Sequence, residues 1–223
     1  MRDTDYNKIE NKIEIYLLRH GLTEANEKKL YCGKTDLPLS ENGVKEILAL
    51  KSQNIYPENP DIFFTSGLLR TSQTINLIYG DVETIIEPLI QEYNFGIFEM
   101  KSYEQLKDDE IYQKWITDQY VGDDAHGVPK FNHNPGDFAC PGGENTKQFN
   151  ERVKKGYINI LNIIKQSKIC SAVISCHGGV IVNILENLMP NVKNFYEWQP
   201  KAGRGYTLIY DFSREGFKEY KNI

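Results

Sequence analysis

A buried strand that ends in charged residues constrains this chain more than any other feature. The run IEIYLL, from Ile13 to Leu18, is apolar, β-branched or aromatic apart from one glutamate, as is typical of a strand in a sheet core. Arg19, His20 and Gly21 follow it at once. In an open α/β sheet, ligands bind beside the loops that leave the carboxyl ends of the strands, so the sequence predicts a site here.

The residue types at this strand end suit an anionic ligand. Arg19 carries a planar fork of N–H donors that matches a phosphate, and His20 can act as a nucleophile or carry a proton. Gly21 lets backbone and ligand approach closely. An arginine and a histidine also occur together at ordinary solvated strand ends. The assignment therefore depends on what the rest of the chain brings to the same edge.

The chain as a whole offers no extended surface for a polyanion. Its 223 residues include 26 basic and 31 acidic side chains, which gives a formal net charge of -5. This balance excludes a global basic field, so we expect neither nucleic acid nor an anionic membrane as a partner. The length suffices for one core, and 14 tyrosines with 10 phenylalanines argue against disorder.

Cysteine usage and hydrophobicity favour a reducing cytoplasm as the location. The four cysteines have no CxxC spacing and indicate neither a disulfide framework nor a zinc ribbon: Cys32, Cys140, Cys170 and Cys176. Residues 1–11 predict a flexible tail, and they lack the apolar core of a secretory signal. No apolar run reaches the roughly 20 residues that span a bilayer.

The rest of the chain alternates between predicted strands and helices. Ser40 is expected to cap a helix, and the apolar sides of this helix and the next are expected to include Leu48 and Leu69. The other expected elements are a helical turn over 23–28, strands over 61–65, 82–86 and 170–175, helices over 68–79, 103–107, 110–118, 146–166 and 180–188, and a hairpin of 206–210 with 217–220. This order predicts a three-layer α/β/α sandwich with a mostly parallel sheet and helices on both faces.

Three of the predicted strands end beside residues that bind anions. Arg70 opens the helix after the second strand, and His177 follows strand 170–175. Because the carboxyl ends of parallel strands share one edge, we expect both to converge with Arg19 and His20. Several like charges without a counterion are costly to bury, so the natural guest is a dianion such as a phosphoryl group.

Phosphate ester chemistry assigns a role to each residue type. A nucleophile must attack phosphorus, the charge on the oxygens must be held, and the leaving oxygen needs a proton. His20, kept neutral by the flanking arginines, is the candidate nucleophile and would form a phosphohistidine. Glu92, in the irregular passage 89–98, is the candidate general acid and then general base. Taken singly, Arg70 and Glu92 also fit surface charges, and His177 fits a polar turn.

Ordered motifs along the chain carry a resemblance to a known family. They are RHGLTEAN at 19–26, DLPLS at 36–40 with NG at 42–43, SGLLRTSQT at 66–74, EYNFGIFE at 92–99, PGGE at 141–144 and SCHGG at 175–179. This set resembles the histidine phosphatase superfamily, the phosphoglycerate mutase-like branch, from about residue 13 to 211. The sequence departs from the family pattern at Met100, where glycine is common, and over 119–140, where no motif matches.

The resemblance implies a phosphoglycerate mutase-like fold, with one histidine phosphatase domain over residues 12–223 and a lid insertion around 100–143. It implies that His20 is the nucleophile, that Glu92 is the acid, and that Arg19, Arg70 and His177 hold the phosphoryl group. Substrate-binding positions implied in addition are Thr23, Asn26 and Gly178. It implies no metal and no cofactor, with a small phosphate ester as the ligand, and it leaves a homodimer open.

The activity expected is that of a metal-independent phosphatase acting on a small phosphomonoester through a phosphohistidine. The sequence looks most like the broad group that includes α-ribazole phosphatases, and the segment between Glu92 and Gly143 looks shorter than in glycolytic mutases. One alternative is phosphoglycerate mutase-type transfer, in which a closed lid keeps the intermediate for a second acceptor. Another is a non-catalytic module that binds phosphorylated ligands, although the nucleophile, acid and arginines are all present.

Two further sets of residues leave alternatives open. A metal site built from His126, His133 and Cys140 has poor spacing and too few ligands, so a polar lid is favoured. A substrate carboxylate or second phosphate could meet one of five basic residues, each of which also fits a solvated surface charge: Lys34, Lys101, Lys130, Lys201 and Arg204.

Overall fold

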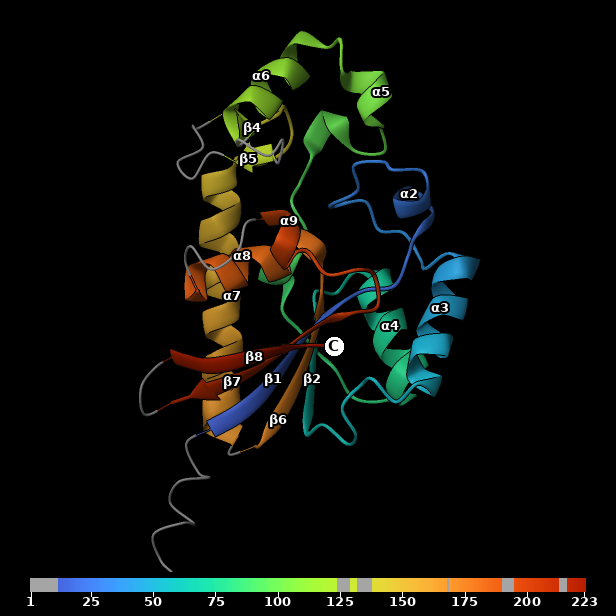
Figure 1. Ribbon diagram of the computed structural model, residues 1–223, viewed down its shortest axis with the longest axis vertical. Coiled ribbons are helices and arrows are strands. Elements are labelled where there is room, and N and C mark those ends of the chain that lie inside the picture. The colour runs from blue at the N-terminus through green and yellow to red at the C-terminus, as the bar shows by residue number, and fades with distance from the viewer. Residues whose placement is uncertain (1–11, 124–128, 132–137, 168, 190–194, 213–215) are drawn as a thin grey trace, which may run out of the picture.

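A six-stranded sheet forms the middle layer of the molecule (Figure 1). The computed structural model describes residues 12–123, 129–131, 138–167, 169–189, 195–212 and 216–223. The strands lie in the order β3-β2-β6-β1-β7-β8, with bounds β1 Lys12–Arg19, β2 Ile62–Thr65, β3 Ile85–Ile86, β6 Ser171–Cys176, β7 Gly205–Asp211 and β8 Gly216–Asn222. Strands β3, β2, β6 and β1 are parallel neighbours, and β7 and β8 continue the sheet antiparallel.

Helices cover both faces of the sheet, which confirms the three-layer sandwich. Figure 1 shows α7 (Thr146–Ser167) and α8 (Gly178–Leu188) on one side, and α3 (Glu41–Ser52) and α4 (Leu69–Tyr79) on the other. Side chains alternate along a strand, so β1 serves both layers. Ile15 and Leu17 pack into the cluster under α7 and α8, whereas Leu18 packs into the cluster under α3 and α4.

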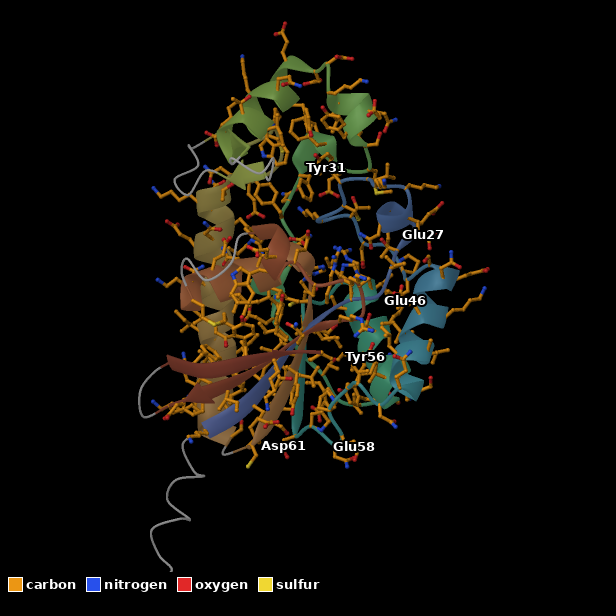
Figure 2. All side chains as sticks on the ribbon, viewed as in Figure 1. Glu27, Tyr31, Glu46, Tyr56, Glu58 and Asp61 are labelled. Atoms are coloured by element: carbon orange, nitrogen blue, oxygen red, sulfur yellow. The ribbon has the colours of Figure 1, made fainter. Side chains whose placement is uncertain are left out.

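A small lobe rises above the carboxyl ends of the parallel strands (Figure 1). It contains η2 (Gly96–Phe98), α5 (Tyr103–Leu106), α6 (Glu110–Gln119), β4 (Tyr120–Asp123) and β5 (Pro129–Phe131). Trp115 lies at its centre, against the rings of Tyr31, Tyr93, Phe95, Phe98 and Tyr112. The hydroxyl groups of Tyr31 and Tyr112 are 2.6 Å apart, which ties the lobe to the loop around α2 (Glu24–Glu27), where Figure 2 labels Tyr31.

The residues predicted to begin α3 and to end α4 do so in the structure. Ser40 caps α3, with its Oγ accepting from the N–H of Gly43 at 3.0 Å, and the helix ends at Ser52. Gly80 ends α4 in a left-handed conformation, with φ at 82°. The closing hairpin forms as β7 and β8. Helix α7 carries an apolar stripe of residues at helical spacing, in which Leu161 is only partly covered and the others are buried: Phe149, Val153, Tyr157, Ile160 and Ile164.

Two apolar side chains expected to face the sheet are exposed instead. Leu48 is 46% exposed because Ile47 and Leu50 already occupy the inner side of α3. Leu69 is 48% exposed because it stands in the first turn of α4, where the buried Arg70 and Thr71 take the inner side. Helical spacing predicts the same buried side along the whole helix, whereas the first turn of α4 buries polar residues on that side.

Other boundaries also differ from expectation. The strand predicted over 82–86 is reduced to Ile85–Ile86, while 88–90 forms the short 3-10 helix η1 (Pro88–Ile90). The segments β4, β5 and α9 (Phe195–Trp198) lie in stretches where no regular structure was predicted. The predicted tail 1–11, His126 and His133 lie outside the described residues. Of the helices that the structure describes, none has the length and apolar character needed to cross a membrane.

Candidate active site

His20 stands directly beyond the carboxyl end of β1, buried to 5% exposure. Its backbone N–H donates to the carbonyl of Cys176 at 3.0 Å, which ties the end of β1 to the end of β6. Its ring Nδ1 lies 2.7 Å from the carbonyl oxygen of Gly21. A carbonyl oxygen can only accept, so Nδ1 carries the proton and Nε2 keeps its lone pair. The local structure therefore selects the tautomer that a nucleophilic Nε2 requires.

His177 lies beside His20 at the junction between β6 and α8. The ring centroids are 5.1 Å apart with an interplanar angle of 65°, and His177 is fully buried. Nδ1 accepts a long hydrogen bond of 3.4 Å from Nε of Arg70, and Nε2 lies 2.9 Å from Oγ of Ser66. Since Nδ1 accepts, Nε2 carries the proton and donates to the serine.

Arg70 is the most completely enclosed cation of the cluster, with 1% exposure. Besides His177, its guanidinium donates to the carbonyl of Gly33 at 2.7 Å and to that of Thr35 at 2.9 Å. The direct hydrogen-bond partners of this buried charge are thus neutral oxygens and a neutral ring nitrogen. Because burial of a cation is costly without a counterion, this environment favours an anionic guest.

Glu99 fixes the loop that receives these Arg70 hydrogen bonds. Its carboxylate accepts from the backbone N–H groups of Gly33, Lys34 and Thr35 at 3.0 to 3.2 Å, and from the hydroxyl of Thr35 at 2.7 Å. It also accepts from the N–H of Phe95 at 3.1 Å. The negative charge of Glu99 is therefore turned toward backbone donors, and loop 33–35 is held between this carboxylate and Arg70.

Arg19 leaves a donor free toward the same cluster. Its Nη1 donates to the carbonyl of Pro200 at 2.7 Å, while Nε is buried and bonds to none of the described residues. Gly178 is close by, since a Cβ at this glycine would lie 3.3 Å from Cζ of Arg19. An enclosed N–H with no partner is costly, and an anion's oxygen would satisfy it.

The electrostatics keep both imidazoles neutral beside charged arginines. Burial, the charge of Arg70 and, more weakly, that of Arg19 hold the pKa of His20 well below the usual 6.5. Burial and Arg70 do the same for the pKa of His177. The pKa values of Arg19 and Arg70 are also lowered, mainly by burial, but guanidinium groups stay protonated at physiological pH.

Glu92 brings a carboxylate to this cluster from the chain that follows η1. Oε2 accepts from the N–H of Gly179 at 3.0 Å, at the start of α8, and Oε1 accepts from the N–H of Tyr93 at 2.9 Å. A Cβ at position 179 would lie 2.5 Å from Oε1, so the approach depends on glycine. Glu92 raises the pKa of both arginines through its charge, which places it electrostatically within the cluster.

Thr23 and Asn26 are nearby in the chain but engage each other. They form the capping box of α2, in which Oδ1 of Asn26 lies 3.0 Å from both the backbone nitrogen and the hydroxyl of Thr23. Neither hydrogen-bonds to Arg19, His20, Arg70 or His177. Nδ2 of Asn26 donates to none of the described residues.

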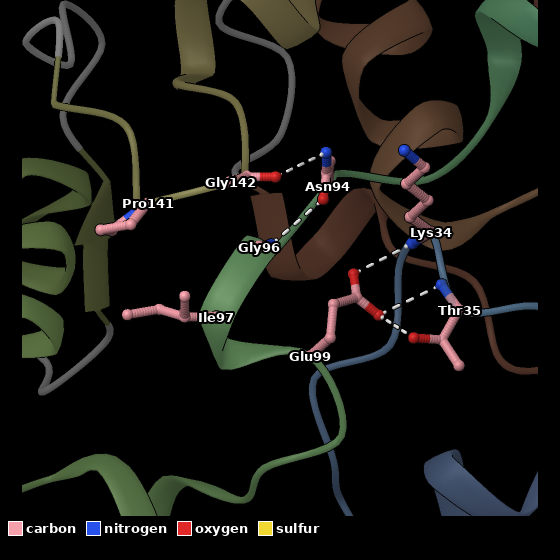
Figure 3. Close-up of a pocket in the computed structure, with 8 residues that line it drawn as sticks. All are labelled: Lys34, Thr35, Asn94, Gly96, Ile97, Glu99, Pro141 and Gly142. Carbon is pink, nitrogen blue, oxygen red and sulfur yellow. Dashed lines mark hydrogen bonds between the residues drawn. The ribbon is translucent and has the colours of Figure 1, made fainter.

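A hollow of about 350 Å³ lies beside loop 33–35 (Figure 3). Its lining consists of Lys34, Thr35, Asn94, Gly96, Ile97, Glu99, Pro141 and Gly142, and so does not include the two arginines or two histidines. Loop 33–35 connects the two regions, because Thr35 lines the hollow and its carbonyl accepts from Arg70. Asn94, which also lines the hollow, follows Glu92 by two residues. Lys34 is exposed and forms no ion pair with a described carboxylate, and Lys101 and Lys201 are exposed elsewhere.

The described residues contain no group of three or more histidine, cysteine, aspartate or glutamate side chains that could hold a metal ion. Cys140 is buried and its Sγ lies 2.8 Å from the carbonyl oxygen of Phe95. Since His126 and His133 lie outside the described residues, a site that includes them is not tested by this arrangement.

Sequence reasoning missed several residues that hold the site together. Glu99, Glu144 and Gly179 lie inside motifs quoted above, but their contacts were not anticipated. Arg152 was missed entirely, although a signal was present. It stands three residues after the buried Phe149 and one before Val153, and thus beside the apolar stripe of α7, where a charged side chain requires a specific partner.

Comparison with known proteins finds a matching family model and several similar chains. The family model described as histidine phosphatase superfamily (branch 1) matches residues 15–221. A 2,3-bisphosphoglycerate-dependent phosphoglycerate mutase from Beijerinckia indica is 29% identical over 217 residues, 94% of this chain and 96% of that protein. An adenosylcobalamin/alpha-ribazole phosphatase from Salmonella typhimurium is 29% identical over 182 residues, 79% of this chain and 80% of that one. The crystal structure of the alpha-ribazole phosphatase from Shigella flexneri superposes with a TM-score of 0.69 at 22% identity, covering 92% of this chain and 94% of that one.

Proposed function

Because the chain belongs to the histidine phosphatase superfamily, branch 1, we propose that it is a metal-independent phosphatase that hydrolyses a small phosphomonoester through a phosphohistidine on His20. One observation carries this proposal. The Gly21 carbonyl holds Nδ1–H of His20, so that an unprotonated Nε2 lies within a buried cluster of two guanidinium groups. A nucleophile with an available lone pair beside fixed positive charge is what attack on a phosphate ester requires.

In the first step, Nε2 of His20 attacks phosphorus and the ester bond breaks. The electron pair of that bond leaves with the ester oxygen, which takes a proton from the carboxyl of Glu92. Nε of Arg19, the guanidinium of Arg70 and the start of α8 at Gly178 hold the charge on the three equatorial oxygens. Nδ2 of Asn26 is available for one of these oxygens, and Thr23 holds that amide in place.

In the second step, water attacks the phosphohistidine. Glu92, now a carboxylate, takes a proton from the water, the bond between phosphorus and Nε2 breaks, and the electron pair returns to His20. Inorganic phosphate then leaves. Glu92 is only partly buried, and the neighbouring hollow is bordered by the exposed Lys34 and Ile97, so water has access to this region. This access favours hydrolysis over retention of the intermediate.

We place the leaving group of the substrate in the hollow beside the cluster. The hollow is large enough for a small organic group, and Lys34 offers it an ammonium that pairs with no described carboxylate. A carboxylate or second phosphate on the leaving group would therefore gain from binding there.

Phosphoglycerate mutase-type transfer is the second candidate, and one observation favours it. The mutase from Beijerinckia indica matches nearly end to end, so overall chain length does not separate the two activities. The difference lies in the fate of the phosphohistidine, which reacts with water in a phosphatase and with a second organic hydroxyl in a mutase.

A screen of metabolite phosphates in the presence of EDTA tests the proposal. Released phosphate is measured for each compound, isomerised phosphoglycerate is measured separately, and the His20→Ala variant serves as the control. We expect phosphate release that EDTA leaves unchanged and that the variant lacks. Isomerisation without net phosphate release would establish the mutase instead, and failure of every ester would leave a binding module.

A further inference from the structure

A partly buried ion pair lies against the passage that carries Glu92. Arg152 of α7 and Glu144, just before α7, are joined twice: Nη2 lies 2.6 Å from Oε1, and Nε lies 3.1 Å from Oε2. Their side chains are only 22% and 13% exposed. The guanidinium also packs over the ring of Phe149, 5.2 Å from its centroid. Two-point pairing of this kind fixes the plane of the guanidinium as well as its position.

The N–H groups of Arg152 that do not reach Glu144 are aimed at main-chain oxygens. Nη1 donates to the carbonyls of Leu89 at 2.8 Å and Gln91 at 2.9 Å, and Nη2 donates to that of Glu92 at 3.2 Å. With the two bonds to Glu144, all five donors of the guanidinium are used. Because three of its five donors bind main-chain oxygens of residues 89–92, Arg152 fixes the backbone conformation of this passage.

Glu144 holds the same passage from the other side. Its Oε1 accepts from the N–H of Asn94 at 2.8 Å, and its own N–H donates to the carbonyl of Asn94 at 3.1 Å. The main chain on both sides of Tyr93 is therefore tied to one ion pair, before it by Arg152 and after it by Glu144.

The ion pair reaches the carboxyl group of Glu92 through a single peptide unit. The carbonyl of Glu92, which accepts from Arg152, and the N–H of Tyr93 belong to the same planar peptide group. That N–H donates to Oε1 of Glu92 itself at 2.9 Å. Rotation of this peptide would withdraw the N–H from the carboxylate and leave only the hydrogen bond from Gly179 to orient it.

From this geometry we propose that Arg152, oriented by Glu144, is a positioning residue that sets the orientation of the Glu92 carboxyl group toward the leaving oxygen. The inference rests on the proposed function, in which Glu92 is the general acid. Arg152 touches no reacting atom in this scheme and acts only through the peptide that joins Glu92 to Tyr93. A role limited to anchoring α7 would instead affect stability alone.

The test compares two esters that differ in their need for an acid. p-Nitrophenyl phosphate has a stable leaving group, whereas an alkyl phosphate such as glycerol 2-phosphate needs its leaving oxygen protonated. For Arg152→Lys, which keeps the charge but has three donors instead of five, we expect kcat/KM, which reports the step that releases the ester oxygen, to fall at least about tenfold more on the alkyl ester than on p-nitrophenyl phosphate. KM for both esters should change less than about threefold.

Three further variants keep the test decisive. In the Glu92→Gln background, Arg152→Lys should cause no additional loss on the alkyl ester, because the group it positions can no longer donate its proton. Glu144→Gln keeps the shape of the side chain, removes the charge and should show the same leaving-group dependence if Arg152→Lys does not fold. Lys155→Ala, an exposed change on the same helix, is the matched control and should leave both esters unaffected.

The outcomes separate this inference from the proposed function. Equal losses of kcat/KM on both esters in Arg152→Lys and Glu144→Gln, or full additivity with Glu92→Gln, would overturn the positioning role while leaving the phosphatase intact. If the wild-type protein hydrolysed neither ester in EDTA, the proposed function itself would be wrong.

Discussion

The rings of His20 and His177 lie 5.1 Å apart, and each is held as a different neutral tautomer. His20 presents a carbonyl-bound Nδ1–H and a free Nε2 lone pair, whereas His177 receives an N–H at Nδ1 and donates from Nε2. The two imidazoles are therefore not interchangeable. This asymmetry assigns the nucleophile to His20 in the proposed mechanism and makes the following predictions specific.

Replacement of His20 by alanine removes the proposed nucleophile. Turnover of p-nitrophenyl phosphate in EDTA should fall at least about a thousandfold, since no other described side chain offers the same lone pair. Rapid quenching of the wild-type enzyme should trap one labelled phosphate per chain, labile to acid as a phosphohistidine is. An acid-stable label, or undiminished turnover by the variant, would contradict the assignment.

Stability should depend on pH through the two buried histidines. Their pKa values lie well below 6.5 in the folded protein, so below pH 6.5 the unfolded chain binds protons that the folded chain does not. Stability is therefore retained above pH 6.5 and lost as the pH falls, with a slope that approaches about 1.4 kcal/mol per pH unit for each histidine. Urea unfolding between pH 7.5 and 5 measures this, and His20→Gln should remove about half of the histidine-dependent slope. An unchanged slope would mean that His20 is not held neutral.

Gly179→Ala places a methyl group against the Glu92 carboxylate. Because the new Cβ would lie 2.5 Å from Oε1, the carboxylate must move and lose the N–H of residue 179. We expect kcat/KM for alkyl phosphates to fall more than tenfold relative to that for p-nitrophenyl phosphate. The unfolding free energy should stay within about 1 kcal/mol of wild type, since alanine favours a helix. In the Glu92→Gln background the substitution should add little.

Arg19→Lys and Arg70→Lys should separate binding from stability. Nε of Arg19 bonds to no described residue, so loss of this donor should weaken competitive inhibition by inorganic phosphate with little effect on folding. Arg70 has three partners in a buried site, and its replacement should cost about 2–4 kcal/mol of unfolding free energy besides weakening phosphate binding. Phosphate inhibition and urea unfolding, measured on both variants, give the comparison. Similar stability losses in the two would show that Arg19 is also a structural residue.

Lys34→Ala tests the proposed place of the leaving group. Loss of the ammonium should raise KM for esters that carry a second anion several-fold and leave KM for p-nitrophenyl phosphate unchanged. Lys101→Ala, an exposed lysine that does not line the hollow, is the matched control. If both variants behave alike, the leaving group lies elsewhere.

The sequence was sufficient to predict the sandwich and the gathering of Arg70 and His177 beside His20, because strand ends in a parallel sheet share one edge. It did not predict that the Gly21 carbonyl selects the tautomer of His20, or that the Glu99 carboxylate binds backbone N–H groups of loop 33–35. Both depend on loops that meet only after folding. Leu69 illustrates a similar limit: helical spacing predicted that it would face the sheet, but the buried Arg70 and Thr71 occupy that side and Leu69 is exposed.

Arg152 shows which part of the structure a sequence pattern can predict and which part depends on contacts that form only in the folded chain. Its position beside the stripe of α7 was visible, but its carbonyl partners at 89, 91 and 92 belong to an irregular passage that no periodicity describes. The segments β4, β5 and α9 were missed for a related reason, because short elements rely on packing rather than on intrinsic propensity.

The position of β6 between β1 and β2 has a consequence for synthesis. β1 and β2 share no backbone hydrogen bonds, so a nascent chain lacking residues 171–176 presents two separate open edges. The strand that joins them also delivers His177. In the proposed mechanism, a chain truncated before residue 171 would therefore lack both the strand that joins β1 to β2 and the second histidine of the site, and its unpaired strand edges would favour self-association.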